Sequence, residues 1–223
     1  AMTQVFHVGR RGLDDLVARY GAATVRECID EMMLRSERQM RDHIEQIPDG
    51  TYHCTDYFDN DGIVDKPLTV KLALTVDGSE MHFDFTGTAP AAAGPLNMAE
   101  TTTRSLSFVA LKHLFPEVPV NGGTFRPTRF TVPQGCILAA QYPSPVCGYT
   151  DVINRIIDVV FGALSQAVPD ITPAAPFGTT GVTTVAGRRE DGRYYVGVFP
   201  YPGGYGGSKA SDGLVNGTLP SSL

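Results

Sequence analysis

Residues 68–85 decide the fold, and they read Leu68-Thr69-Val70-Lys71-Leu72-Ala73-Leu74-Thr75-Val76-Asp77-Gly78-Ser79-Glu80-Met81-His82-Phe83-Asp84-Phe85. Nearly every second residue is a large apolar one, which is the period of a strand with one buried face. Asp77 and Gly78 are typical of the two central residues of a type I′ turn, and the apolar positions continue on the return strand. The segment therefore predicts a β-hairpin that packs one face on a core.

Two helices are expected before this hairpin. Residues 13–20 predict a short helix that ends at Gly21, and residues 22–47 predict a long one that Pro48 stops. Apolar residues of the long helix recur at spacings of three and four, which indicates one amphipathic stripe. We expect the stripe to be a core face rather than a groove for a partner. Its members are Val25, Cys28, Ile29, Met32, Met33, Met40, Ile44 and Ile47.

The remaining segments predict an α+β fold. Helices are expected over residues 100–115 and from Thr150 to Pro169, and the second is so apolar that it should be buried on most sides. Antiparallel hairpins packed with the long amphipathic helix and one or two further buried helices belong to the α+β class. The expected strands are residues 51–58, 67–76, 81–85, 128–132, 137–141, 180–187 and 193–200.

Size and charge limit the function. A chain of 223 residues with 42% hydrophobic content can bury a core, and we expect a single α+β portion over residues 3–223, with Ala1-Met2 a cloning remnant and start residue. The net charge of -6, without a Lys/Arg cluster, argues against nucleic acid or an anionic membrane as partner. No segment approaches the roughly 20 apolar residues of a membrane span, so we expect a cytoplasmic protein.

No metal site is predicted from the spacing of the cysteines and histidines. The four cysteines and five histidines are widely scattered, without a Cys-x-x-Cys pair or the spacing of a zinc site. We therefore expect reduced thiols and no metal bound by these residues.

Three stretches rich in glycine, proline and asparagine stand out, at residues 83–97, 121–127 and 203–213. Glycine beside proline bends the backbone into fixed shapes that can present N–H groups to a ligand or a partner. In the first stretch Asp84 ends a strand between two aromatic residues, which makes it a candidate acid or base. The alternative is that Asp84 caps the turn that it begins.

The second and third stretches are candidate binding loops for an anion. Arg126 could hold a phosphate or carboxylate while the glycines present N–H groups to it, and its alternative is a salt bridge to Asp151 or Asp158. The third stretch lacks the ending of a phosphate-binding P-loop, so a tight crossing or a subunit contact, with Tyr205 as the packing anchor, explains it at least as well. The candidate residues are Asn121, Gly122, Gly123, Arg126, Gly204 and Gly206.

Five collinear phrases resemble the hydantoinase B family. This family includes the B subunits of N-methylhydantoinase, the C-terminal half of 5-oxoprolinase, and components of acetone and acetophenone carboxylases. The resemblance covers nearly the whole chain and rests on residues 84–90 with 94–97, 119–127, 140–146, 155–164 and 203–207.

Members of the family are longer than this chain. Their N-terminal region carries a Gly-Gly-Thr-His-x-x-Asp phrase and a His-His-x-Asp phrase, neither of which occurs here, and their sequence continues beyond residue 223. The chain also stops in polar loop chemistry at residues 220–223. We therefore expect an internal piece of a hydantoinase B type subunit, lacking the family's N-terminal region and C-terminal end.

The resemblance implies ATP-dependent hydrolysis of a small cyclic amide, such as a hydantoin, 5-oxoproline or another lactam. A hydantoinase A type ATPase, in a hetero-oligomer, would bind ATP and Mg and phosphorylate the carbonyl oxygen. This piece would hold no cofactor of its own, and a divalent metal would belong to the family's N-terminal region. Two alternatives stay open, namely a piece of an ATP-dependent ketone carboxylase and a non-catalytic scaffold or interaction module.

Overall fold

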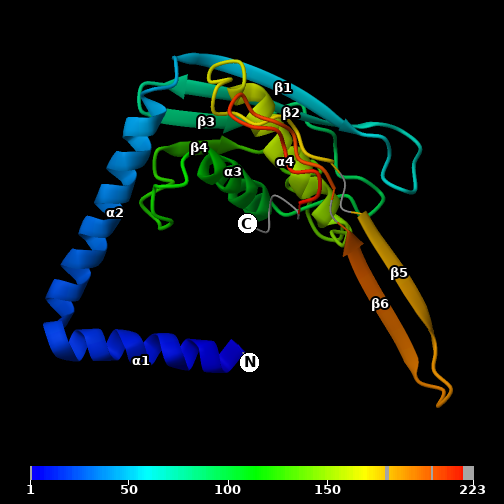
Figure 1. The fold of residues 1–223 in the computed structure, drawn as a ribbon, viewed down its shortest axis with the longest axis horizontal. Coiled ribbons are helices and arrows are strands. Elements are labelled where there is room, and N and C mark those ends of the chain that lie inside the picture. The colour runs from blue at the N-terminus through cyan, green and yellow to red at the C-terminus, as the bar shows by residue number, and fades with distance from the viewer. Residues whose placement is uncertain (1, 179–180, 202, 218–223) are drawn as a thin grey trace.

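A four-stranded sheet with two helices against its inner face forms the body of the molecule (Figure 1). This computed structural model describes residues 2–178, 181–201 and 203–217, so the predicted polar ending at 220–223 lies outside it. Strand order is β1-β2-β3-β4, antiparallel for the first two pairs and parallel between β3 and β4. The strands are β1 (Gly50–Phe58), β2 (Leu68–Asp77), β3 (Glu80–Asp84) and β4 (Thr128–Thr131), and the helices are α3 (Glu100–Leu114) and α4 (Tyr149–Leu164).

Alternation along β2 and β3 builds the core, as the sequence predicts. Successive side chains of a strand point to opposite faces, so one face of the hairpin can be wholly apolar. α4 packs against β1, β2 and α3 and is buried along most of its length, which confirms the expected buried helix. The fully or almost fully buried residues of the hairpin are Val70, Leu72, Leu74, Val76, Met81, Phe83 and Phe85.

The turn of this hairpin differs by one residue from the predicted one. Asp77 pairs with Glu80, so the two-residue loop is Gly78-Ser79. Gly78 has φ 55°, whereas among the described residues none other than glycine has positive φ, so the turn cannot be type I′. A glycine at the first loop position is the pattern of a type II′ turn, which twists the strands in the same sense.

Helices α1 (Met2–Tyr20) and α2 (Ala22–Ile44) form an arm that leaves the body, bent at Gly21 with φ 81° (Figure 1). The predicted core stripe of α2 is wrong for its first half. Met40, Ile44 and the following Ile47 are buried, but Ile29 is 46% exposed and Met32 60% exposed. Only the C-terminal end of α2 reaches the sheet, and the N-terminal half of the helix projects away from the core (Figure 1).

A second projection is the hairpin of β5 (Gly181–Arg188) and β6 (Tyr194–Tyr201), which confirms the two last predicted strands (Figure 1). The strand predicted over residues 137–141 is wrong, because these residues form turns. Ile137, Leu138 and Ala139 are nevertheless buried. α4 ends at Leu164, five residues before the proline that was expected to stop it.

The observed architecture is α+β, as predicted. Among the described residues, no helix is both long enough and apolar enough to cross a bilayer. All four cysteines are free thiols.

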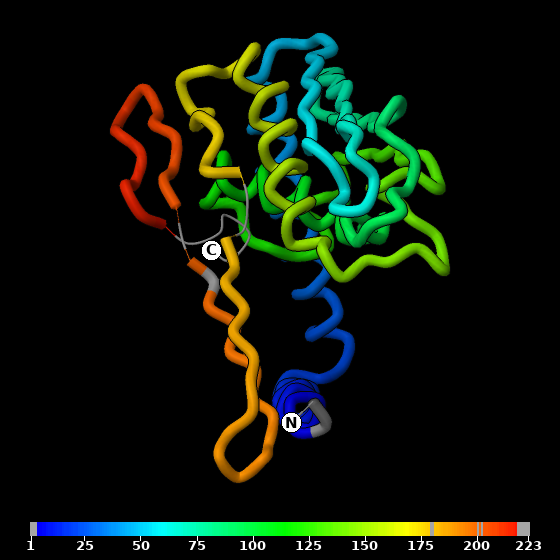
Figure 2. Tube along the Cα trace, turned by 90° about the vertical axis from the view of Figure 1, so that its right-hand side faces the viewer, coloured from blue at the N-terminus to red at the C-terminus, as the bar shows by residue number. Residues whose placement is uncertain are grey.

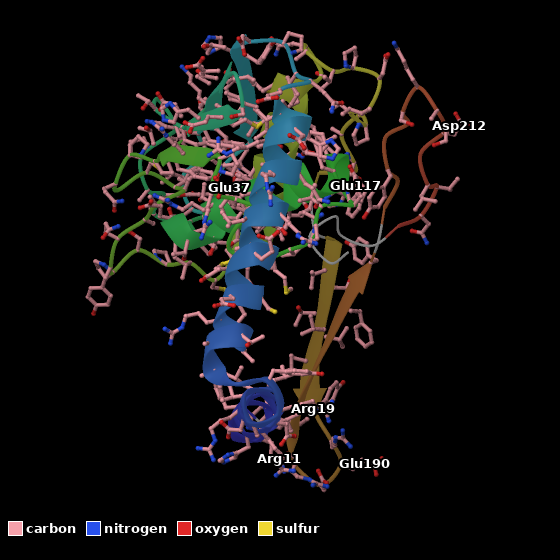
Figure 3. The ribbon with its side chains drawn as sticks, turned by 90° about the vertical axis from the view of Figure 1, so that its left-hand side faces the viewer. Arg11, Arg19, Glu37, Glu117, Glu190 and Asp212 are labelled. Carbon is pink, nitrogen blue, oxygen red and sulfur yellow. The ribbon has the colours of Figure 1, made fainter. Side chains whose placement is uncertain are left out.

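The second glycine-rich stretch fastens α2 to the body. The backbone of Gly123 lies so close to α2 that a Cβ there would be 1.9 Å from the carbonyl oxygen of Met33. Asn121 donates to the hydroxyl of Ser36 at 2.7 Å, and Arg126 pairs with Glu37 at 3.1 Å. Figure 3 shows Glu37 where α2 meets the body, with Arg11 and Arg19 on the distant α1.

Replacing Gly123 by alanine should therefore destabilise the chain. A Cβ 1.9 Å from a backbone oxygen forces the helix and loop apart, which typically costs about 1–3 kcal/mol. The matched control is Gly122→Ala, whose Cβ meets only the flexible Met33 sulfur at 3.6 Å and should change stability by less than about 0.5 kcal/mol. Urea denaturation measures both, and equal effects of the two variants would contradict the close contact.

Candidate functional site

Asp84 caps a turn at the end of β3. Its carboxylate accepts the backbone N–H of Thr86 at 2.8 Å, which is the alternative that the sequence left open. The side chain is half-buried and lies beside Thr131 of β4 in the parallel pair. The acid or base role of Asp84 stays a prediction.

The second stretch packs against α2. Asn121 accepts the N–H of Gly123 at 2.8 Å through its side-chain oxygen, and this bond shapes the loop that packs on α2. The partner of Arg126 is Glu37, and not Asp151 or Asp158 as the sequence suggested. Hydrogen bonds from Arg126 and Arg41 hold the pKa of the Glu37 carboxyl below its usual value. Binding of an anion by this loop remains a prediction.

The third stretch is a tight crossing of two chain segments. Figure 2 shows the segment from residue 203, in red, beside the yellow segment that follows α4. Ala174 donates its N–H to Gly207 at 2.9 Å, and Phe177 donates to Gly204 at 3.0 Å. A Cβ on Gly206 would lie 2.2 Å from the carbonyl oxygen of Ala174, so only glycine fits.

Two buried polar side chains, Asn97 and Asp61, hold the first stretch in shape. The sequence analysis did not identify them as a pair. Asn97 is fully buried and bonds the backbone of Ala92, Gly94 and Pro145. Asp61 accepts the N–H groups of three residues, among them Gly94 at 2.8 Å. These backbone bonds lower the pKa of Asp61 to about 2, so it stays a carboxylate and shapes the loop.

A hollow of about 390 Å³ lies between α4 and the crossing of the third stretch. Its volume is at the lower end of the roughly 300–1,000 Å³ that is typical of ligand pockets. Its wall is mostly apolar, with Phe161 and Pro173 among the lining residues, and Asp158 of α4 is part of it. A few polar groups in an apolar wall are the usual composition of a small-molecule site.

Arg155 fixes the carboxylates next to this hollow. Its guanidinium contacts Asp56 of β1 at 2.5 Å through Nη1 and Asp158 at 2.9 Å through Nη2. Gly178, with φ 69°, lies against the guanidinium, where any Cβ would be 2.1 Å from Nη2. α4 is thus joined to the sheet by one arginine between two acids.

Two buried side chains of α4 lack hydrogen bonds. Asp158 is 7% exposed. It forms an ion pair with Arg155, but neither of its oxygens accepts a well-directed hydrogen bond. Asn154, one helical turn earlier, is 1% exposed and both its amide atoms lack a partner. Most buried polar groups in proteins are bonded, so this adjacent pair is a candidate functional position.

The Asp158 carboxyl can accept or release a proton near neutral pH. Burial raises its pKa to about 6, although Arg155 opposes the shift, and Asp56 adds to it. Groups with a strongly shifted pKa in a hollow are candidate functional residues. The sequence contained a signal for this site, because Asn154 and Asp158 are polar residues four apart in a stretch, residues 152–164, whose other members apart from Arg155 are apolar.

A larger hollow of about 600 Å³ lies on α3 and is lined mainly by apolar side chains. Lys112 contributes to it, but its ammonium group donates to the carbonyl oxygens of Phe115, Pro116 and Val118. His113 also lines this hollow. Its Nδ1 is hydrogen-bonded to the Val109 carbonyl oxygen, and its Nε2 lacks a hydrogen-bond partner. The α4 hollow is the stronger candidate, because the buried Asp158 with its raised pKa is among its lining residues.

No ligand set for a metal exists in residues 2–178, 181–201 and 203–217, since no three His, Cys, Asp or Glu side chains gather there. The residues described thus do not fit the divalent metal that the family resemblance implies elsewhere in such subunits. We derive no step through a metal.

The structure is that of an α+β protein with a buried carboxyl and a buried amide on α4, the carboxyl beside a hollow. The chain belongs to the hydantoinase B/oxoprolinase family, whose model matches residues 1–221.

Relatives show what this chain is similar to. A protein from Pseudomonas sp. (strain NS671), named provisionally as the B subunit of a D-/L-hydantoinase, is 29% identical over 93% of the chain and 37% of its own length. The beta subunit of caprolactamase from Pseudomonas jessenii is 29% identical over 92% of the chain and 36% of its length. The chain thus spans little more than a third of the length of these curated relatives.

Two solved structures share the fold. The ATP-dependent caprolactamase from Pseudomonas jessenii matches with a TM-score of 0.80 and 27% identity, over 93% of this chain and 37% of that one. Acetone carboxylase matches with a TM-score of 0.81 and 16% identity, over 96% of this chain and 31% of that one. The second match shows likeness of fold alone.

Asp158→Asn should stabilise the chain at neutral pH. The folded state holds the Asp158 proton more tightly than the unfolded state, so folding stability falls as pH rises from about 4 to about 6 and stays lower above. A shift from 3.8 to about 6 corresponds to a loss on the order of 3 kcal/mol. Asparagine abolishes this loss, while Arg155 keeps Asp56 as its partner.

Urea denaturation at pH 4 and pH 7.5 measures this effect. Asp158→Asn should gain about 1–3 kcal/mol over the parent chain at pH 7.5 and little at pH 4. The exposed Asp59 provides a control, since Asp59→Asn removes the same charge where solvent screens it. A gain of equal size at both pH values would contradict a raised pKa of Asp158.

Proposed function

We propose that this chain is part of the B-type subunit of an ATP-dependent enzyme that hydrolyses small cyclic amides, with ATP bound by a hydantoinase A type partner. The observation that carries the proposal is the agreement of relatives named for different cyclic amides. They include the hydantoinase and caprolactamase subunits and a 5-oxoprolinase from Arabidopsis thaliana, 26% identical over 68% of the chain. Hydantoin, caprolactam and 5-oxoproline share one chemical feature, an amide closed into a ring.

ATP is needed because an amide carbonyl is a poor electrophile. Phosphorylation of the carbonyl oxygen on the partner subunit makes that oxygen a leaving group and develops charge that positioned donors must stabilise. The B-type subunit would then guide water to the activated ring. Matched over 93% of its length by an ATP-dependent caprolactamase, this chain supplies part of the framework for that step.

Reconstitution tests the proposal. The complete B-type subunit that contains this chain, mixed with a hydantoinase A type partner, should hydrolyse ATP faster when hydantoin, 5-oxoproline or caprolactam is added. Acetone and acetophenone, the substrates of the carboxylase alternative, should not accelerate it. Stimulation by a ketone alone would replace the hydrolase proposal by the carboxylase one, and stimulation by none of these compounds would favour a scaffold.

The 223-residue chain by itself should show no turnover. Activation requires the partner's ATP site, and the chain spans only 37% of the length of its hydantoinase relative. Phosphate release is measured with ATP and each cyclic amide. Hydrolysis by the purified chain, at a rate that survives repeated purification, would contradict the requirement for a partner.

Asp84→Asn in the same complex tests the predicted acid or base. Asparagine keeps an oxygen that can accept the Thr86 N–H, so the turn should persist while proton transfer is lost. A catalytic Asp84 predicts a fall in kcat of about 100-fold or more. Unchanged kcat would leave Asp84 only its turn-capping role.

A further inference from the structure

The hairpin of β5 and β6 lies outside the core of the body. Its strands pair with each other from end to end, and no other helix or strand of the described residues packs extensively against them. An isolated two-stranded hairpin is at best marginally stable in water. The stability of this hairpin therefore requires a cover that the described residues do not provide.

Both faces of the hairpin are apolar. Directly opposite residues share a face, so the even-numbered residues of the two strands form one face and the odd-numbered residues form the other. An antiparallel sheet that packs on one side has one apolar face and one polar face. Two apolar faces indicate a ribbon with protein on both sides. The apolar side chains, each between 40% and 66% exposed, are Val182, Val196 and Val198 on the even-numbered face and Tyr195, Phe199 and Tyr201 on the odd-numbered face.

Charge is nearly absent from the two strands. Their one charged residue is Arg188, whose guanidinium lies over the Tyr194 ring, 4.4 Å from its centroid. Residues 194–199 contain no charge and no proline, and all but one of them are aromatic or β-branched. Such a segment is an aggregation hazard when it is exposed, and free strand edges usually carry charges or proline. The composition therefore suits strands that are covered at all times.

The tip of the hairpin differs from its strands. Four of the five residues in the loop 189–193 are charged. Burial of unpaired charges is costly, so this loop is suited to water. Figure 3 shows Glu190 at the tip, away from the body. The pattern indicates a ribbon that is covered along its strands and reaches solvent at its end.

The helical arm presents a second uncovered apolar surface. Phe6 of α1 is 77% exposed and Met32 of α2 is 60% exposed. Figures 1 and 3 show that the arm and the hairpin extend to the same side of the body. Large exposed apolar surfaces mark sites of interaction with other protein. One further mass of protein, placed between the arm and the hairpin, would cover both.

The length of the relatives indicates what this mass is. The matched caprolactamase chain has 63% of its length outside the part that this chain covers at 37%. The unmatched 7% of the 223 residues here, about 16 residues, is shorter than the hairpin over residues 181–201, so the hairpin recurs at least in part in that longer chain. Permanent contacts are more apolar than those of partners that dissociate. Covalently attached polypeptide provides such a permanent cover.

We propose that the β5–β6 hairpin inserts into the part of the same B-type subunit that lies outside residues 1–223, with apolar side chains of that part on both of its faces. The arm contacts the same part of the subunit. This inference rests on the proposal that the chain is part of a longer B-type subunit, and it does not depend on the substrate. The hairpin and the arm thereby join two parts of one polypeptide.

Photo-cross-linking in the complete B-type subunit that contains this chain tests the insertion. One variant carries p-benzoylphenylalanine in place of Val198, on the even-numbered face, and another carries it in place of Phe199, on the odd-numbered face. Each probe should form cross-links within one subunit, to residues outside this chain, identified by mass spectrometry of the digested monomer band. A probe in place of Glu190, in the charged loop, measures the background of an exposed position. Equal yields at all three positions would overturn the proposal.

The cross-linked products distinguish the possible covers. A cross-linked dimer of the subunit would assign the hairpin to a second copy, and a cross-link to the hydantoinase A type partner would assign it to that subunit. Either result would contradict insertion into the same polypeptide. Cross-links from one face alone would mean that the ribbon lies on a surface, which also contradicts insertion.

Hydrogen exchange provides a second readout. Backbone amides of residues 194–201 should exchange at least about tenfold more slowly in the complete subunit than in the 223-residue chain, because covered strands open less often. The amides of β2 and β3 serve as the internal control and should be protected in both. Val198→Asp should remove the protection of residues 194–201 in the complete subunit, whereas Val198→Ile should keep it. Should Val198→Asp fail to fold, the comparison of the two parent forms decides, and equal exchange in both would refute the cover.

These experiments need neither ATP nor a cyclic amide, so their outcome is separate from that of the proposed function. An active complex in which the probes reach only the partner subunit would overturn the inference and leave the function standing. Cross-links within one subunit from both faces, in a complex that does not hydrolyse cyclic amides, would support the inference and overturn the function.

Discussion

Arg155 joins α4 to the sheet through two carboxylates, and the buried layer of the molecule depends on this junction. The guanidinium bridges the half-buried Asp56 of β1 and the buried Asp158 of α4, so loss of Arg155 would leave two carboxylates, one of them buried, without a cation. Burial drives Asp158 toward its neutral form, Arg155 opposes this shift, and the charge of Asp56 adds to it. The helix is thus held in part by a carboxyl whose pKa burial raises to about 6.

Local sequence patterns predicted which segments form helices and strands better than they predicted what packs against those elements. The alternation from Leu68 to Phe85 identified the central hairpin, and the apolar run of α4 identified a buried helix. Periodicity also found the stripe of α2, but it cannot say what covers an apolar face, and Ile29 and Met32 are exposed. The parallel pairing of β3 with β4 joins residues more than 40 positions apart, for which no local signal exists.

The glycine-rich stretches show the same limit for the site. Gly122 and Gly123 are neighbours in sequence, but only Gly123 approaches a backbone, that of Met33. Chemistry-bearing residue types made Asp84 and Arg126 candidates, and the structure gives both of them bonds within the protein. Asp158 carried only a local signal, its spacing of four from Asn154. Asp56, the second acid that Arg155 contacts, lies nearly 100 positions from that arginine, so no local pattern shows the junction.

The arm formed by α1 and α2 has a mechanical consequence. α2 has 23 residues and is therefore about 35 Å long, but its buried residues, from Ser36 onward, lie in its second half. A sideways force on the Gly21 end of α2 would tilt the helix about the contact between Met33 and Gly123. Because the loop of Gly123 leads directly into β4, tilting the arm would pull on the edge of the sheet.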